Sequence, residues 1–97
     1  MVHTIVDRFA PQQVVLFGSY ARGEADRDSD VDFLVVLDHV PNRRATAVQI
    51  RLALNPRTLP IDVLVATPDR LATVGTVRGT VLHAALTEGV TLYQRAA

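Results

Sequence analysis

The stretch that decides the fold runs from Val14 to Leu37 and reads VVLFGSYARGEADRDSDVDFLVVL. It holds a short apolar run, a Gly-Ser turn, a charged loop that ends in Asp-Val-Asp, and a second apolar run. Five of the nine residues from Glu24 to Asp32 are carboxylates, and two nearby arginines offset only part of that charge. Because a charge that enters an apolar strand is costly unless it is paired or bound to a cation, this arrangement indicates a functional site.

Outward from this stretch, the chain alternates between strand and helix patterns. The run 31–37 is almost wholly apolar, which predicts a central strand covered on both faces. Thr67-Pro68-Asp69 is typical of a helix start, with an N-cap, a proline at the first helical position and an acid in the first turn. The alternation predicts one small α/β or α+β domain over residues 1–97. The other expected elements are helices at 2–9, 42–54 and 78–88, a helical turn at 19–22, strands at 13–17, 61–66 and 90–93, and a turn at 55–60.

The expected helices at 42–54 and 78–88 each have an apolar face that we expect to pack inward. Gly89 follows the second of them at the position where a glycine often ends a helix. Arg43, Arg44 and Arg51 are most simply a solvated face of the first helix, and a partner surface is the alternative interpretation. The expected inward residues are Ala45, Val48 and Leu52, with Ile50 and Leu54 alongside, in the first helix, and Val77, Val81, Leu82 and Ala85 in the second.

Composition narrows the class of protein. The chain has 97 residues, 48% of them hydrophobic and 21% charged, which argues against disorder and leaves apolar surface for a partner to cover. The net charge is zero, so no global field favours nucleic acid or an anionic membrane. The chain has no cysteine, which excludes disulfides and thiolate metal sites. No apolar run reaches membrane-spanning length, and we expect a cytoplasmic protein.

Three acids form the candidate metal site. Asp30 and Asp32 project the same way because alternate residues of a strand share a face. Two such carboxylates repel each other unless a cation or a proton intervenes, and oxygen ligands suit Mg²⁺ before Mn²⁺. Asp-x-Asp alone can also be turn chemistry, and Asp62, which lies inside the apolar run 60–65, can be an exposed edge-strand acid. If the two strands are neighbours, Asp62 completes a triad able to hold two metal ions for phosphoryl or nucleotidyl transfer.

The Gly-Ser turn supplies a candidate phosphate site. Gly18 follows a strand and lets the backbone approach a phosphate closely, and the next turn offers free N–H groups. Ser19 adds a hydroxyl donor. Arg22, one turn later, reaches either the same phosphates or the acidic loop, and the sequence does not separate the two. A P-loop is excluded because no Gly-Lys-Ser or Gly-Lys-Thr is present.

Gly18-Ser19, ten further residues, Asp30-Val31-Asp32 and a later strand acid at Asp62 resemble the DNA polymerase β-type nucleotidyltransferase superfamily. The surrounding GSYARGEADRDSDVDFLVV and the closing EGVTLYQ are similar to its minimal MNT or MntA-type branch. The resemblance implies a mixed β-sheet flanked by helices, ATP as donor and two Mg²⁺ ions. It implies that the three acids bind metal and catalyse, and that Gly18 and Ser19, with Arg22, hold phosphates.

The same resemblance implies an antitoxin of a HepT/HEPN toxin pair, which transfers AMP from ATP to a tyrosine hydroxyl of the toxin. Larger relatives carry a helical domain that shapes the acceptor pocket, so we expect the acceptor to dock from outside and to form an oligomer with this chain. We expect no membrane partner and no direct nucleic-acid binding. The alternatives are nucleotidyl transfer to a small molecule such as an aminoglycoside, and a non-catalytic antitoxin that neutralises its partner by binding alone.

Overall fold

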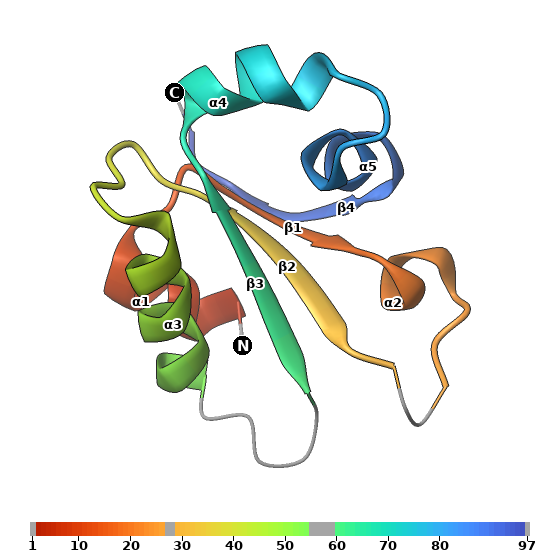
Figure 1. Cartoon of the computed structure of the whole chain (residues 1–97). Coiled ribbons are helices and arrows are strands. Elements are labelled where there is room, and N and C mark those ends of the chain that lie inside the picture. Colours follow the sequence, from red (N-terminus) through yellow and green to blue (C-terminus); the bar gives the residue numbers. More distant parts are fainter. Residues whose placement is uncertain (1, 27–28, 55–59, 97) are drawn as a thin grey trace.

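A four-stranded mixed sheet forms the centre of the molecule, as a computed structural model that describes residues 2–26, 29–54 and 60–96 shows (Figure 1). The strand order is β3-β2-β1-β4, with bounds Ile61–Ala66, Val31–Val36, Gln13–Phe17 and Val90–Gln94. β2 and β3 are parallel, whereas β1 is antiparallel to both β2 and β4. The predicted mixed α/β architecture and all four predicted strands are therefore confirmed, with ends that shift by a residue.

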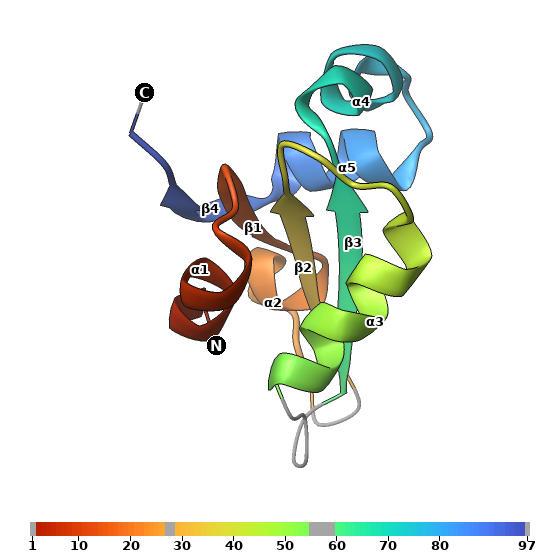
Figure 2. The same ribbon diagram turned by 90° about the vertical axis from the view of Figure 1, so that its left-hand side faces the viewer.

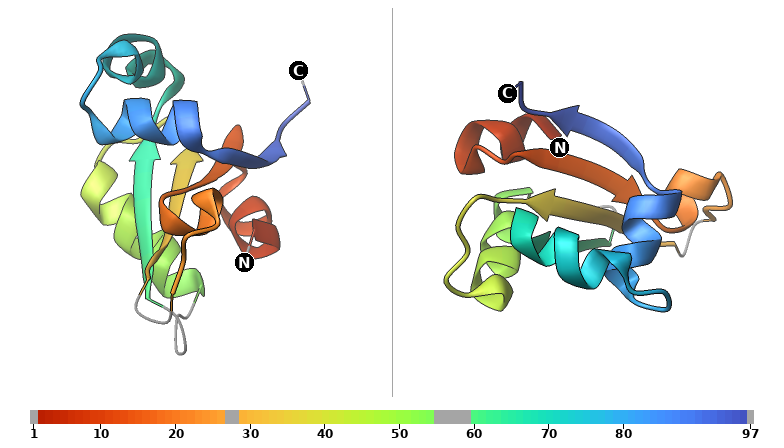
Figure 3. Two further views of the ribbon diagram at one scale, coloured as in Figure 1. Left: turned by 90° about the vertical axis from the view of Figure 1, so that its right-hand side faces the viewer. Right: turned by 90° about the horizontal axis from the view of Figure 1, so that it is seen from above.

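Helices cover both faces of the sheet. α1 (Val2–Phe9) and α3 (Arg43–Leu54) lie on one face, which Figure 2 shows from the front. α4 (Pro68–Thr73), the 3₁₀ turn η1 (Val74–Thr76) and α5 (Val81–Glu88) lie on the other, and α2 (Ser19–Arg22) stands at the end of β1 (Figure 3). None of the helices in the described ranges is long and apolar enough to cross a membrane.

The central strand explains why two separate cores form. Alternate residues of a strand point to opposite faces, so β2 sends Phe33 and Val35 toward α1 and α3, and Leu34 and Val36 toward α5. All four of these side chains are almost completely buried. The prediction that this strand is covered on both faces is confirmed, because β1 and β3 flank it and helices lie above and below.

Helix α3 corrects the predicted apolar face. Its buried residue is Ile50, whereas Val48 and Leu52 are 51% and 71% exposed. The prediction was wrong because it put Ile50 at the margin of the buried face, when Ile50 is its centre and Ala47 and Leu54 pack beside it. The helix begins at Arg43, one residue later than predicted, because the Asn42 side chain accepts a hydrogen bond from the Ala45 backbone N–H as an N-cap. The predicted turn at 55–60 lies, apart from residue 60, outside the described residues.

Helix α5 is shorter than predicted, and only part of its predicted inward face is buried. It begins at Val81, because the Thr80 hydroxyl accepts a hydrogen bond from the His83 backbone N–H at 3.1 Å and caps it. Leu82 and Ala85 are buried as predicted, but Val77 and Val81 are 53% and 61% exposed. By contrast, the predicted N-cap of α4 at Thr67 is confirmed.

Gly89 ends α5 for a different reason from the one predicted. Its φ is −77°, which is not the left-handed conformation of a typical glycine cap. A Cβ at this position would collide with the Val15 side chain and the Ala85 carbonyl oxygen, and would lie 3.1 Å from the Leu16 carbonyl oxygen. The glycine therefore allows α5 to turn directly into β4 against the back of β1.

Candidate active site

The register of the sheet places the strand acids side by side. Asp32 is opposite Asp62 across the parallel pair β2/β3, and opposite Phe17 across the antiparallel pair β1/β2. Residues opposite each other in adjacent strands share a face, so all three point to the side of the sheet that carries α5. The expected neighbourhood of the two strands is confirmed, and with it the pairing of Asp32 with Asp62.

A pocket of about 240 Å³ contains these two carboxylates. Asp32 is half-buried and Asp62 is exposed, because β2 is an inner strand and β3 is an edge strand. Larger hollows of about 390 and 490 Å³ occur elsewhere, and neither contains a strand acid. Of these three pockets, only the smallest has carboxylates from two adjacent strands, which can bind a cation or take a proton. It is therefore the candidate site. Its lining residues are Phe17, Asp32, Asp62, Val63, Leu64 and Val81.

Several negative charges lie close together in and beside the pocket. Burial raises the pKa of Asp32 above its ordinary value, and the negative charges of Asp62 and then Asp30 raise it further. The positive charge of Arg22 lowers that pKa by a smaller amount. Asp32 is therefore a carboxylate whose negative charge is only partly compensated by the protein, which is the condition that favours a bound cation.

Gly18 lies directly against Asp32. Its φ is +75°, a conformation that side chains rarely adopt, and a Cβ there would collide with Asp32 Oδ2 and lie 3.1 Å from Cγ. The predicted phosphate turn and the predicted metal acid are thus one continuous site. Ser19 follows as the first residue of α2, which has only four residues and which the hydrogen bond from Arg22 N–H to the Gly18 carbonyl closes at 3.2 Å.

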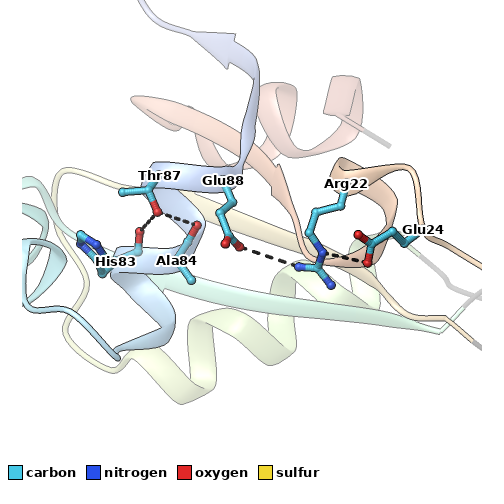
Figure 4. A network of polar contacts seen from close by, with 6 residues as sticks. All are labelled: Arg22, Glu24, His83, Ala84, Thr87 and Glu88. Atoms are coloured by element: carbon cyan, nitrogen blue, oxygen red, sulfur yellow. Dashed lines mark hydrogen bonds and ion pairs between the residues drawn. The ribbon is translucent and has the colours of Figure 1, made fainter.

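Arg22 is held between two carboxylates (Figure 4). Its Nε donates to Glu24 Oε2 at 3.3 Å, and its terminal nitrogen lies 3.8 Å from Glu88 Oε2 on α5. The arginine therefore pairs with the acidic loop, one of the two roles that the sequence left open, and stays close enough to Asp32 to lower the pKa of that acid. Glu88 was missed by the sequence analysis, since no local pattern connects it with a residue so far away in the chain.

The predicted metal triad is gathered only in part. Among residues 2–26, 29–54 and 60–96, no group of three or more His, Cys, Asp or Glu side chains is placed to hold a metal ion. Asp32 and Asp62 share the pocket, whereas Asp30 precedes β2 and does not line it. The donor set still fits a hard divalent cation, because two carboxylates face one pocket and the half-buried one lacks a full counter-charge. The metal-binding role of the three acids stays a prediction.

The walls of the pocket could not be foreseen from the sequence. Phe17 comes from the end of β1, and Val81 comes from the first turn of α5, far away in the sequence. Both are ordinary apolar residues in the sequence, and only the packing of α5 over the sheet makes them part of a site.

Comparison with solved structures supports the fold. The chain is similar to a crystal structure of a toxin–antitoxin with AMP-PNP, with a TM-score of 0.66 and 21% identity over 97% of this chain and 70% of that one. A crystal structure of a mutant of the toxin–antitoxin MntA–HpeT gives a TM-score of 0.65 and 19% identity, with the same coverage of 97% and 70%. At these identities the likeness shows a shared fold.

Curated relatives share shorter stretches. A protein of Methanocaldococcus jannaschii, provisionally named a protein adenylyltransferase, is 39% identical over 54 residues, which are 56% of this chain and 54% of the relative. The protein adenylyltransferase MntA of Thermococcus cleftensis is 50% identical over 36 residues, or 37% of this chain and 36% of the relative. The matches thus span about half or less of the length of these relatives. The family model described as the nucleotidyltransferase domain matches residues 2–83, most of the chain. This chain, with its Gly18-Ser19 turn set against Asp32, therefore belongs to the nucleotidyltransferase-domain family.

Proposed function

We propose that this protein transfers AMP from ATP to a hydroxyl group of a partner protein. The observation that carries the proposal is the pairing of Asp32 with Asp62 in one pocket, with the backbone of Gly18 pressed against the Asp32 carboxylate. Phosphates held at that backbone would lie beside two carboxylates, which is the arrangement that nucleotidyl transfer requires. The MntA protein adenylyltransferase among the relatives supports AMP as the transferred group.

Each residue has a distinct part in the proposed reaction. The acceptor oxygen attacks the α-phosphorus of ATP in line, a new P–O bond forms, and the bond to the β-phosphate oxygen breaks to release pyrophosphate. The backbone N–H groups at Gly18 and Ser19, and the Ser19 hydroxyl, hold the phosphates. Asp62 is exposed at the open edge of the pocket, where an acceptor arrives, so it accepts the hydroxyl proton.

Asp32, Asp62 and Asp30 would hold Mg²⁺, which would neutralise charge on the triphosphate and on the leaving pyrophosphate. Arg22 would contribute a second positive charge if it exchanged Glu24 and Glu88 for phosphate oxygens. Both roles use groups that already surround the half-buried Asp32 carboxylate.

The proposed acceptor is a tyrosine of a HEPN-type toxin, which this protein would inactivate as its antitoxin. The crystal structures of similar fold are of toxin–antitoxin proteins, which supports a toxin as the partner. A pocket of about 240 Å³ with an open edge at Asp62 suits a side chain presented on another protein, since it is too small to enclose both ATP and a second whole substrate.

The test is an intact-mass measurement. The purified protein is incubated with ATP, Mg²⁺ and the product of the adjacent gene, which we propose is the HEPN-type partner, and we expect that partner to gain the mass of one or more AMP units. Asp32→Asn and Asp62→Asn should each prevent this gain. The proposal is wrong if the wild-type protein leaves the partner unmodified, or if both variants modify it at the wild-type rate.

A further inference from the structure

One face of α3 has no partner among the residues that the structure describes. Arg44, Val48, Arg51 and Leu52 are spaced i, i+4, i+7 and i+8, which places them on one side of a helix. Val48 is 51% exposed and Leu52 is 71% exposed. The opposite side of the helix packs on the sheet through Ile50. We call these four residues the α3 stripe; Figure 2 shows α3, the helix that carries it, in front of the sheet.

The charge of the α3 stripe is of one sign. The helix sequence RRATAVQIRLAL contains three arginines and no acidic residue. Within the described ranges the ion pairs use His3, Arg22 and Arg95, and neither Arg44 nor Arg51 takes part in one. A basic helix face with two exposed aliphatic side chains between its arginines is complementary to an acidic segment that also presents apolar residues.

The α3 stripe lies next to the candidate active site. A hollow of about 140 Å³ is lined by Arg44, Val48 and Arg51 together with Asp62 and Val63 of β3. Asp62 also lines the pocket that contains Asp32 on the other side of the sheet edge. A protein that rests on the α3 stripe would therefore reach around the open edge of β3 and meet Asp62 directly.

We propose that the α3 stripe is the docking surface for the acceptor protein, which binds through an acidic amphipathic segment. Its apolar side chains cover Val48 and Leu52, and its carboxylates pair with Arg44 and Arg51. This inference rests on the proposed function and adds to it the surface that selects the acceptor. A protein fits better than a nucleic acid, because the stripe has aliphatic residues between the arginines and no aromatic residue on which a base would stack.

The experiment separates docking from chemistry. Isothermal titration calorimetry measures the affinity for the proposed HEPN-type partner, taken as the product of the adjacent gene, and separately the affinity for ATP with Mg²⁺. The test variant is Arg44→Glu with Arg51→Glu. The matched control is Arg8→Glu with Arg78→Glu, which makes the same change of charge at two exposed arginines outside the stripe. Circular dichroism checks that both variants fold as the wild type does.

We expect the stripe variant to bind the partner at least about ten-fold more weakly, since two attractive charge pairs become repulsive. Its ATP affinity should fall by much less than its partner affinity, because both arginines line the hollow beside Asp62 but neither lines the pocket of Asp32. The control variant should bind the partner as the wild type does. A second variant, Val48→Ser with Leu52→Ser, should weaken partner binding without any change of charge.

Three results would overturn the docking surface: unchanged partner affinity in the stripe variant, an equal loss in the control, or no binding by the wild type. A dimer of this chain that the stripe variant dissociates would also overturn it, because the occupant would then be a second copy. If the wild type binds the partner but transfers no AMP, the proposed function fails while the affinities still decide the docking surface.

Discussion

Strands β2 and β3 start with the same pattern, a branched apolar residue followed by an aspartate and four apolar residues, and the sheet gives the two acids different surroundings. Asp32 and Asp62 are opposite each other in register and line one pocket. Asp32, on the inner strand, is half-buried and its pKa is raised by burial and by two neighbouring carboxylates. Asp62, on the edge strand, is exposed. Position in the sheet, rather than local sequence, therefore distinguishes the two acids. In the proposed reaction the inner acid holds charge beside Gly18, and the outer acid meets the acceptor.

The largest expected effect comes from Gly18→Ala, which disturbs Asp32 and leaves Asp62 in place. The new Cβ would displace the Asp32 carboxylate, and we expect AMP transfer to fall by roughly 100-fold or more, since a shift of about 1 Å at a reacting group has that cost. Gly23→Ala is the matched control. Gly23 also has a positive φ, of +73°, but nothing lies within 4 Å of the point that a Cβ there would occupy, so transfer should stay near wild type.

Intact-mass measurements over time give the transfer rate of each glycine variant. If both variants lose transfer equally, backbone strain alone disturbs the turn. In that case the close approach of Gly18 to Asp32 would have no special role in the pocket.

The second prediction concerns how Asp32 and Asp62 each affect the stability of the folded protein. Asp32→Asn removes a charge that burial and two like charges oppose, so the free energy of unfolding should rise by about 0.5 to 1 kcal/mol after screening by solvent. Asp62→Asn, at an exposed position, should change it by less than about 0.5 kcal/mol. Urea denaturation at neutral pH without divalent cations measures both. The comparison between the strands fails if Asp62→Asn stabilises the protein as much as Asp32→Asn.

The third prediction tests Arg22, whose positive charge lowers the pKa of Asp32. Arg22→Ala should raise the KM for ATP by about five- to ten-fold, because a charge-assisted contact to phosphate is lost. Glu88→Gln should change that KM by less than about two-fold, and downward, since its contact with Arg22 is a long, exposed ion pair of 3.8 Å. Steady-state transfer at varied ATP concentration measures both values. A rise in KM for Glu88→Gln would mean that Glu88 positions Arg22 instead of competing for it.

The smallest effect is expected past the far end of β2, where Asp38 has the opposite electrostatic surroundings to Asp32. Hydrogen bonds from Arg95, at 3.0 Å, lower the pKa of Asp38, and its charge is fully exposed. A lowered pKa in the folded state contributes stability that is present above the ordinary pKa and is lost as the pH falls through the lowered value. Asp38→Asn should therefore be slightly less stable than wild type at neutral pH and equal to it in acid, as urea denaturation at both pH values would show. A difference that grows in acid would contradict this assignment.

Much of the fold could be predicted because the strong signals are local. The apolar run 31–37, the N-cap at Thr67 and the glycine that ends β1 each act within a few residues, and the structure confirms the elements they predict. The inward side of α3 was predicted wrongly, and that of α5 only in part, because Val81 is exposed whereas Leu82 and Ala85 are buried as predicted. Apolar residues lie on more than one side of each helix, so the sequence does not mark a unique inward side. Ile50 in α3 and Leu82 in α5 are the residues that packing selected.

The candidate reacting groups follow from the sequence alone: a Gly-Ser turn after one strand, an Asp-x-Asp entering the next, and an isolated acid in a third. The acids conflict with their apolar surroundings, and that conflict is readable without coordinates because burying a charge is costly. Their arrangement appears only in the folded chain, where Asp32 and Asp62 share a pocket that Asp30 does not line, Gly18 lies against Asp32, and Glu88 pairs with Arg22. These are contacts between elements distant in the chain, and they follow from strand order, register and the seating of α5, which no local pattern encodes.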